Sequence, residues 1–387
     1  MATRRIVIDL LAASTGGQLT RARAFLARLR RYDANSEIWL LQENDALGSC
    51  AQRPDLNVVN LTSKSGRLRA LRRMAWLNLR LPALIKRHRI DTYISFSHYL
   101  PWTLPRGVRS VVGVSNLAPF SQAALDAETK TWPRLRLLAL RRTILSATRR
   151  ADRVIALSEA CRTVLTDNGI PPARISVIPN GVEIASTDTS AAALVVLRER
   201  YSIPAQYLLY VSHFYPYKNF IRLVEAYAQL PSVFRESHAL VLVGVPHDRD
   251  YFQSIEAAIG RLGIAKQVRI IPGLSAAELA PLYAHASLFV FPSLIENSPN
   301  ILLEAMAYGA PVLAGTHDPI PEFGGDAIRY FDAFDSASMA REIAAVLTDE
   351  AAMSRLRAAA RARAARYSWD EFTKRVVSLY SDTVLVT

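Results

Sequence analysis

The sequence predicts an α/β protein made of two doubly wound parallel sheets, each covered by helices on both faces. Three observations support this class. The chain has 387 residues, which is more than one ordinary domain holds. Short apolar runs alternate with helical stretches, as in βαβ units. The alternation restarts after the segment VIPNGVE, so we expect a first domain over residues 1–182 and a second over residues 183–368.

The strands expected in the first half are short and almost wholly apolar, which is typical of parallel strands buried on both faces. The first run, residues 6–11, leads into STGGQLTRARAFLARLRRY, where Gly16 and Gly17 mark the turn into a helix. The remaining expected strands of this half are residues 37–41, 92–96, 110–114, 154–157 and 175–178.

The second half repeats the pattern and ends in helices. A break at Tyr367-Ser368 precedes a closing helix, expected from Trp369 to about Val384 and extended to residue 387 in our domain assignment. The strands expected in this half are residues 207–211, 239–243, 268–271, 288–291 and 312–314.

Composition excludes several classes of protein. Half of the residues are hydrophobic, so each half can bury its own core. The cysteines, Cys50 and Cys161, are too few and too far apart for a disulfide framework or a structural zinc site. No uncharged apolar run reaches the roughly 18 residues of a transmembrane helix. The apolar N-terminal run is interrupted by Asp9, which favours a buried strand over a signal peptide, and we expect a cytoplasmic protein.

The positive charge is concentrated in the first half. Residues 1–182 hold 29 Lys and Arg against 12 Asp and Glu, a net charge of +17, which leaves −4 for the rest. Residues 56–90 contain no acid and interleave basic residues with leucines. A basic amphipathic helix there would attract an anionic membrane surface. The alternative, a solvated helix whose leucines pack on the domain, stays open.

The segment ENSPNILLEAMAYGAPVL follows an expected strand and predicts a ligand site. In parallel sheets the ligand lies beyond the carboxyl ends of the strands. We expect Ser298 to cap a helix that has Pro299 at its first position and that ends before Gly309. The first-turn amides would then form an anion site, at Asn300, Ile301 and Leu302.

Two carboxylates flank this helix start, and neither suits an anion. Glu296 precedes the cap and Glu304 lies in the helix. A carboxylate is a strong acceptor for paired hydroxyls, so a phosphate that carries a sugar on one side and a ribose on the other would explain both. The alternative is that the two glutamates are an ordinary loop residue and an ordinary helix residue.

Two further segments fit the same ligand. In YVSHFYPYKNFIRLVEAY, Lys218 stands just before a helix led by Asn219, where it can neutralise a departing diphosphate, although it could also be a surface lysine. At Gly16 and Gly17 the missing side chains would let the backbone approach a ligand, although tight turns need glycine in any case.

Taken together, these segments resemble the GT-B glycosyltransferases of family 4, a retaining group, over nearly the whole chain. ADRVIALSEACRTVLTDNGIPPARISVIPNGVE resembles the interdomain signature of that family. VRIIPGLSAAELAPLYAHASLFVFPS resembles the segment lining its nucleotide pocket, and ENSPNILLEAMAYGAPVLA is similar to its two-glutamate motif. YSWDEFTKRVVSLY looks like its final helix, which crosses back onto the N-terminal domain. The resemblance implies two Rossmann-like domains facing each other across a cleft.

The resemblance also implies roles for single residues. Glu296 would hold hydroxyls of the transferred sugar, and Glu304 would hold the ribose. Lys218 would offset charge on the diphosphate, which the backbone at Gly17 would approach from the other domain. The remaining implied donor contacts are the amides of Asn300, Ile301 and Leu302 and, for the base, Pro272, Gly273 and Leu274. No divalent metal and no cofactor is required in this family.

Two positions depart from the family pattern. The family usually places an arginine five residues before the lysine, but this chain has His213, and a neutral imidazole would clamp the diphosphate more weakly. In VVGVSNLAPFSQ, Ser115 and Asn116 stand where the family often has a histidine facing the reacting centre. We interpret Asn116 as a polar contact there, because an amide cannot accept a proton as a general base does.

The segment HDRD, at residues 247–250, matches the D-x-D by which another class of glycosyltransferase binds manganese. Because it follows an expected strand and precedes an expected helix, we interpret its acids as helix-start residues favoured by the helix dipole. We expect no metal site.

The sequence thus predicts a retaining hexosyltransferase that takes a mannose- or rhamnose-type sugar from a nucleotide donor, with GDP sugars preferred and UDP-hexoses close behind. The expected acceptor is a lipid-linked saccharide of bacterial lipopolysaccharide, O-antigen or capsule synthesis, reached at the inner face of the cytoplasmic membrane. The alternatives are a GT-B epimerase or phosphorylase, or a basic nucleic-acid-binding protein, of which no recognised module is present.

Overall fold

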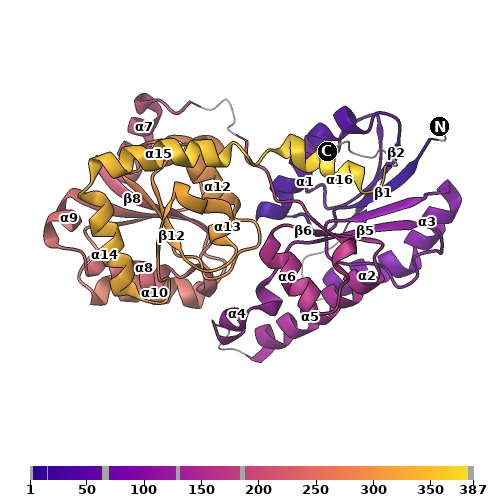
Figure 1. The fold of residues 1–387 in the computed structure, drawn as a ribbon, viewed down its shortest axis with the longest axis horizontal. Helices are drawn as coiled ribbons and strands as arrows, with labels where there is room; N and C mark the ends of the chain where they lie inside the picture. The colour runs from indigo at the N-terminus through magenta and orange to yellow at the C-terminus, as the bar shows by residue number, and fades with distance from the viewer. Residues whose placement is uncertain (1–2, 15, 63–68, 128–130, 184–187, 382–387) are drawn as a thin grey trace. The chain divides into compact units, whose positions relative to one another are not determined.

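The structure is a computed structural model that describes residues 3–14, 16–62, 69–127, 131–183 and 188–381 (Figure 1). The chain forms two compact units. Unit 1 comprises Met1–Phe120, Trp132–Gly181 and Ser368–Thr387, and unit 2 comprises Ser121–Thr131 and Val182–Tyr367. The grouping of Ser121–Thr131 with unit 2 differs from the expected first domain of residues 1–182, because α4 (Gln122–Ala127) contacts η4 (Pro216–Lys218).

Unit 1 is built on a seven-stranded parallel sheet in the order β3-β2-β1-β4-β5-β6-β7, counted over the described residues. Its strands are β1 (Arg5–Asp9), β2 (Glu37–Glu43), β3 (Leu56–Leu61), β4 (Thr92–Ser95), β5 (Arg109–Val114), β6 (Arg153–Ala156) and β7 (Ile175–Val177). Its helices are α1 (Gly16–Tyr32), α2 (Arg69–Leu79), α3 (Leu81–His88), α5 (Thr131–Arg150), α6 (Glu159–Asp167) and α16 (Trp369–Ser378). Two apolar clusters, one on each face of the sheet, bury its strands.

Unit 2 is built on a six-stranded parallel sheet in the order β10-β9-β8-β11-β12-β13, again over the described residues. Its strands are β8 (Gln206–Val211), β9 (His238–Val243), β10 (Val268–Ile271), β11 (Leu288–Phe291), β12 (Val312–Gly315) and β13 (Arg329–Phe331). Its larger helices are α7 (Ala191–Tyr201), α8 (Phe220–Ala228), α10 (Arg249–Arg261), α11 (Ala276–His285), α12 (Asn300–Ala307), α14 (Ser336–Leu347) and α15 (Glu350–Ala364). The shorter helices α9 (Ser232–Ser237) and α13 (Ile320–Gly324) complete it.

The predicted fold class, two doubly wound parallel sheets, is therefore confirmed. Each sheet has one place where the strand order reverses. In unit 1 it lies between β1 and β4, and in unit 2 between β8 and β11. Loops that leave two neighbouring strands in opposite directions open a crevice at such a switch point, which is where ligands of these sheets bind.

Three expectations need correction. The strands β3 and β13 were not expected from the sequence, since both lie at sheet edges and three of the six residues of β3 are exposed. The acid-free segment of residues 56–90 is not one amphipathic helix. In its described part it is strand β3 followed by α2 and α3, which meet at Arg80. Two of its expected basic residues, Lys64 and Arg67, lie outside the described residues.

The closing helix α16 packs against α1 in unit 1, as the resemblance implied (Figure 1). It ends at Ser378, six residues before the expected end near Val384, which lies outside the described residues. Asp370 accepts hydrogen bonds from Arg28 at 3.1 Å and from Tyr32 at 2.8 Å. Gly181 contacts the start of α16 so closely that a Cβ would lie 2.2 Å from the amide nitrogen of Trp369. None of the described helices is long and apolar enough to cross a membrane.

Candidate active site

The switch point of unit 2 brings together two residues predicted from the sequence. Lys218 follows β8 and Glu296 follows β11, and the two strands are neighbours in the sheet. The Lys218 Nζ donates to the Glu296 Oε1 over 2.6 Å, with side chains that are 15% and 12% exposed. Residues 78 positions apart therefore form one ion pair at the crevice expected to hold the ligand.

Local hydrogen bonds fix the loop that carries Lys218. The phenol of the buried Tyr210 donates to the Lys218 carbonyl at 2.9 Å. Asn219 adopts a left-handed conformation with φ of 62°, which asparagine tolerates better than most residues. The side-chain Nδ2 of Asn219 donates to the carbonyls of Pro292, which follows β11, and Ala333, which follows β13. The lysine therefore projects from a backbone tied to two neighbouring loops.

Lys218 keeps its positive charge within this ion pair. Burial alone would lower the pKa of Lys218, but the Glu296 carboxylate and the nearby Tyr217 outweigh it and raise the pKa above its usual value. Lys218 also lies 5.2 Å from the Tyr217 ring centroid. The ammonium group is therefore charged at neutral pH and available to an anionic ligand that can displace the glutamate.

Glu304, on α12, is held in a largely apolar environment. Burial raises the pKa of Glu304 to about 7, although the Tyr283 hydroxyl, 3.4 Å from Oε2, opposes this by hydrogen bonding. Tyr283 is fully buried and stacks against Tyr308. A carboxylate this poorly solvated would gain most from hydroxyl donors supplied by a ligand.

The start of α12 differs from the prediction. The N-cap is Pro299, not Ser298, and no side chain caps the helix. The amide of Asn300 donates to the Ser298 carbonyl at 2.9 Å, so it is engaged inside the loop. Of the three predicted amides, those of Ile301 and Leu302 remain candidates for contact with an anion. Gly309 follows the last turn of the helix with φ of 76°, as predicted.

The imidazole that replaces the family arginine lies beside the ion pair. The pKa of His213 is lowered by burial and then by His247 and Lys218, so the ring is neutral at pH 7. Its Nδ1 is buried and has no partner among the described residues. The His247 ring packs edge-on against it at 4.6 Å. A neutral ring here can donate or accept one hydrogen bond, but it adds no charge to a diphosphate clamp.

His317 was missed by the sequence analysis although it follows β12 at the same edge of the sheet. Burial lowers its pKa despite the opposing effects of the Ser293 backbone and Glu296. Its Nε2 is buried without a partner among the described residues. The rule that selected the other loops, a polar residue just after a buried strand, would have found it.

Gly273 and Leu274 follow β10, two strands away from β8. A Cβ at Gly273 would lie 2.7 Å from the Val245 side chain, so a larger residue would displace the loop after β9. Leu274 is partly buried. The structure brings both to the carboxyl edge of the sheet that also carries His213 and Lys218.

The predicted residues of unit 1 lie at the carboxyl edge of its own sheet. Gly16 opens α1 with φ of 59°, and Gly17 follows in the first turn, after β1. Asn116 follows β5, and its side-chain oxygen accepts the amide of Ala118 at 2.9 Å. That bond occupies the oxygen and leaves the NH₂ group of Asn116 for a ligand.

Arg21 and His98 are two further residues at this edge that the sequence analysis did not select. Arg21 is 2% exposed, donates to the Ser115 hydroxyl and lies over the Phe96 ring. Burial lowers its pKa to about 10. Burial, then Arg21 and Arg73, lower the pKa of His98 to about 4, so this ring is neutral. Arginine within a helix and histidine after a strand are common, so neither gave a signal.

The acids of HDRD serve the helix, as interpreted from the sequence. Asp248 is the N-cap of α10 and accepts the amide of Tyr251 at 3.0 Å, and Asp250 lies in the first turn. In the part of the chain that the structure describes, no group of three or more His, Cys, Asp or Glu residues could hold a metal ion.

Two family models match most of the chain. The model of the glycosyl transferases group 1 matches residues 199–363, and the model of glycosyltransferase family 4 matches residues 15–186. The chain belongs to the GT-B glycosyltransferases. This confirms the resemblance seen in the sequence, and the first model spans both members of the ion pair.

Related proteins include two mannosyltransferases of Escherichia coli. The serotype-specific mannosyltransferase WbdA of Escherichia coli is 32% identical over 224 residues, which cover 57% of this chain but only 27% of WbdA. The O-antigen chain mannosyltransferase B of Escherichia coli is 26% identical, over 80% of this chain and 77% of its own. The D-inositol 3-phosphate glycosyltransferase of Salinispora tropica is 27% identical, over 72% of this chain and 60% of its own.

Solved structures share the fold. The Anabaena protein Alr3699/HepE, in complex with UDP and glucose, has a TM-score of 0.75 at 20% identity and covers 99% of this chain and 100% of its own. WaaG, a glycosyltransferase involved in lipopolysaccharide biosynthesis, has a TM-score of 0.74 at 18% identity, over 98% and 100%.

Proposed function

We propose that this glycosyltransferase moves a hexosyl group of the mannose or rhamnose type from a nucleotide diphosphate sugar to a lipid-linked saccharide in lipopolysaccharide or O-antigen synthesis. The observation that carries the proposal is the Lys218–Glu296 ion pair at the switch point of unit 2. The mannosyltransferases among the relatives support the sugar, and GDP-mannose or GDP-rhamnose is the preferred donor, with UDP-hexoses next.

The donor would exchange this ion pair for its own contacts. Lys218 and the amides of Ile301 and Leu302 would take the diphosphate, Glu296 would take hydroxyls of the sugar, and Glu304 would take those of the ribose. Lysine and helix start would then stabilise the departing diphosphate, which is where charge develops in the transition state. We propose retention of configuration by front-face displacement, in which a diphosphate oxygen assists removal of the acceptor's proton.

A thermal-shift panel of GDP-mannose, GDP-rhamnose and UDP-glucose tests donor binding. The cognate donor at a hundred times its dissociation constant should stabilise the protein by about 2.7 kcal/mol. Incubation with a lipid-linked saccharide should then release nucleoside diphosphate and extend the saccharide by one α- or β-linked residue of unchanged configuration. Stabilisation by no sugar nucleotide, or a covalent glycosyl ester on Glu296, would contradict this mechanism.

We propose that the reaction needs no divalent metal and no other cofactor. Turnover in excess chelator should equal turnover without it. Loss of turnover that manganese restores would contradict the proposal and would favour Asp248 and Asp250 as metal ligands.

We further propose that the protein works at the inner face of the cytoplasmic membrane, held by the positive charge of unit 1. Residues 1–182 carry a net charge of +17. The protein should float with vesicles that contain phosphatidylglycerol and should be released by high salt, since exposed charges are screened beyond about 3 Å at 1 M. Flotation that ignores lipid charge would contradict this role.

A further inference from the structure

A cavity of about 1000 Å³ opens in unit 1. It lies at the amino-terminal edge of the sheet, whereas Gly16, Gly17 and Asn116 lie at the carboxyl edge. Arg109 is the first residue of β5, Arg153 is the first residue of β6, and Arg174 directly precedes β7. All three line the cavity at the amino ends of adjacent strands. Because the residues proposed for catalysis follow carboxyl ends, this cavity is a separate site.

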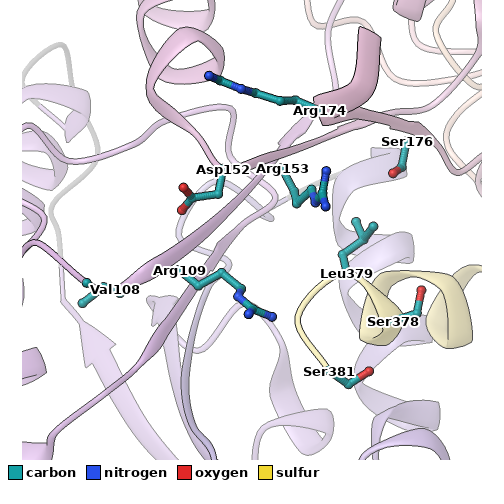
Figure 2. Close-up of a pocket in the computed structure, with 10 residues that line it drawn as sticks. Val108, Arg109, Asp152, Arg153, Arg174, Ser176, Ser378, Leu379 and Ser381 are labelled. Atoms are coloured by element: carbon teal, nitrogen blue, oxygen red, sulfur yellow. The ribbon is translucent and has the colours of Figure 1, made fainter. Parts of the chain in front are cut away.

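The opposite wall of the cavity comes from the end of α16. Ser378, Leu379 and Ser381 line it together with Ser176 of β7. Figure 2 shows the side chains of Arg109 and Arg153 extending from the two strands toward this wall, whereas Arg174 extends away from it. Two guanidinium groups and several hydroxyls therefore share one cavity.

Main-chain carbonyls hold the guanidinium groups in place. Arg109 donates to the Tyr380 carbonyl at 3.0 Å, and Arg153 donates to the Ala173 carbonyl at 2.9 Å. A guanidinium has five N–H donors, so a single carbonyl orients the Arg153 head group without exhausting it. Preorganised arginines of this kind suit the bidentate recognition of phosphate.

Among the described residues that line the cavity, the three arginines outnumber the one acid, Asp152. The Oδ2 of Asp152 accepts the amide and the hydroxyl of Ser110, at 2.8 and 2.7 Å. The cavity therefore keeps an excess of positive charge. Its volume is at the upper end of the range for small-molecule sites and far exceeds that of a bare anion.

We propose that this cavity binds a phosphate ester of a polyol, with the phosphate on Arg109 and Arg153 and the polyol hydroxyls on the serines of the α16 wall. Such a ligand is either a soluble sugar or glycerol phosphate or the head group of a phospholipid. The proposal is independent of the transfer reaction, because no residue of the cavity belongs to the candidate active site.

Arginine labelling tests the site residue by residue. The full chain would be treated with phenylglyoxal at fixed ionic strength, alone, with glycerol 3-phosphate, and with phosphatidylcholine vesicles that contain phosphatidylglycerol, and peptides would be read by mass spectrometry. We expect protection of Arg153 and Arg109. Arg261, exposed in the last turn of α10 in unit 2, should be labelled equally in all samples.

Protection by glycerol 3-phosphate assigns a soluble ligand, and protection by the vesicles alone assigns a lipid head group. Equal labelling of Arg153 in all three samples would overturn the proposal and leave the arginines as partners of main-chain carbonyls. Arg153→Gln should weaken binding of the protecting probe about tenfold, which is the scale of one charge-assisted contact, and Arg261→Gln should not. Unchanged binding in Arg153→Gln would also overturn it.

Discussion

The switch points of the two sheets have the same topology and different electrostatics. In unit 2, Lys218 and Glu296 form an ion pair that a charged ligand can exchange. In unit 1, the buried Arg21 faces the neutral Ser115 hydroxyl, and the neighbouring His98 is neutral. Topology alone thus places the loops, and the side chains decide what each crevice can bind. The crevice of unit 2 holds a cation paired with a carboxylate, whereas the charged guanidinium of Arg21 in unit 1 donates to a neutral hydroxyl.

Removing the ion pair of unit 2 should have the largest effect on turnover. Lys218→Ala or Glu296→Ala should lower turnover by about 10²- to 10³-fold, the scale of one preorganised electrostatic contact to the leaving group. Steady-state kinetics would measure it, with Lys266→Ala, an exposed lysine of the same unit, as the matched control.

The paired variant Lys218→Met with Glu296→Gln guards against misfolding, because it leaves no buried charge unpaired. Its thermal melt should resemble that of the parent protein while its turnover stays low. Near-normal turnover in this variant would remove the ion pair from the mechanism.

Glu304→Gln separates binding from stability at the same crevice. The pKa of Glu304 rises from its ordinary 4.5 to about 7 on folding, so the folded state binds more protons between these values. Stability of the free protein should therefore fall as pH rises from 4.5 to 7, by up to about 3 kcal/mol. The glutamine variant should be more stable than the parent at pH 8 by about 1 to 3 kcal/mol.

The same variant should bind the cognate nucleoside diphosphate about tenfold more weakly, because the amide is a poorer acceptor for paired hydroxyls than the carboxylate. Denaturant melts at pH 5 and pH 8, together with calorimetric titration, measure both effects. A glutamine variant that is less stable at pH 8 would mean that the carboxylate has an ionised partner in the free protein.

His213→Arg sharpens the comparison by adding charge to unit 2. A second cation beside Lys218 should tighten binding of the nucleoside diphosphate about tenfold, since a guanidinium can contact phosphate through two N–H groups. His285→Arg places the same charge at an exposed position of α11 and should leave affinity unchanged. Weaker binding in His213→Arg would show that the neutral ring itself contacts the ligand.

Asn116→Ala should have the smallest effect, and it should change the KM for the acceptor alone. Loss of one neutral hydrogen bond predicts about a fivefold rise in the KM for the acceptor, with donor affinity unchanged. Varying each substrate in turn at saturation of the other distinguishes the two. A change in donor affinity instead would move Asn116 to the donor side.

The sequence predicted the strands best where apolar residues run without interruption. The range expected for β11 matches the structure, because all four of its residues are apolar and buried. The range expected for the edge strand β10 also matches, although Arg269 interrupts its apolar run. Edge strands β3 and β13 were missed, since one is half exposed and the other has three residues. Lys218 and Glu296 were both predicted, but their direct contact was not, because no local pattern joins residues 78 positions apart.

Helix ends and buried environments were harder to predict. Ser298 and Pro299 satisfy the preferences for a capped helix start, yet the loop engages Asn300 and shifts the cap by one residue. The raised pKa of Glu304 and the neutral state of His98 arise from desolvation by residues distant in sequence. Such effects depend on three-dimensional packing and leave no spacing to read.

The position of α16 has a consequence for dissecting the protein. Since Ser368–Thr387 belong to unit 1 and Val182–Tyr367 belong to unit 2, the larger segment of unit 2 lies in the chain between two segments of unit 1. The amide of Val182 donates to the carbonyl of Tyr367 at 2.9 Å, so entry and exit of this segment are joined at its base. Shortening the polypeptide from its tail would therefore remove α16 from unit 1, the half that begins at the opposite end of the sequence.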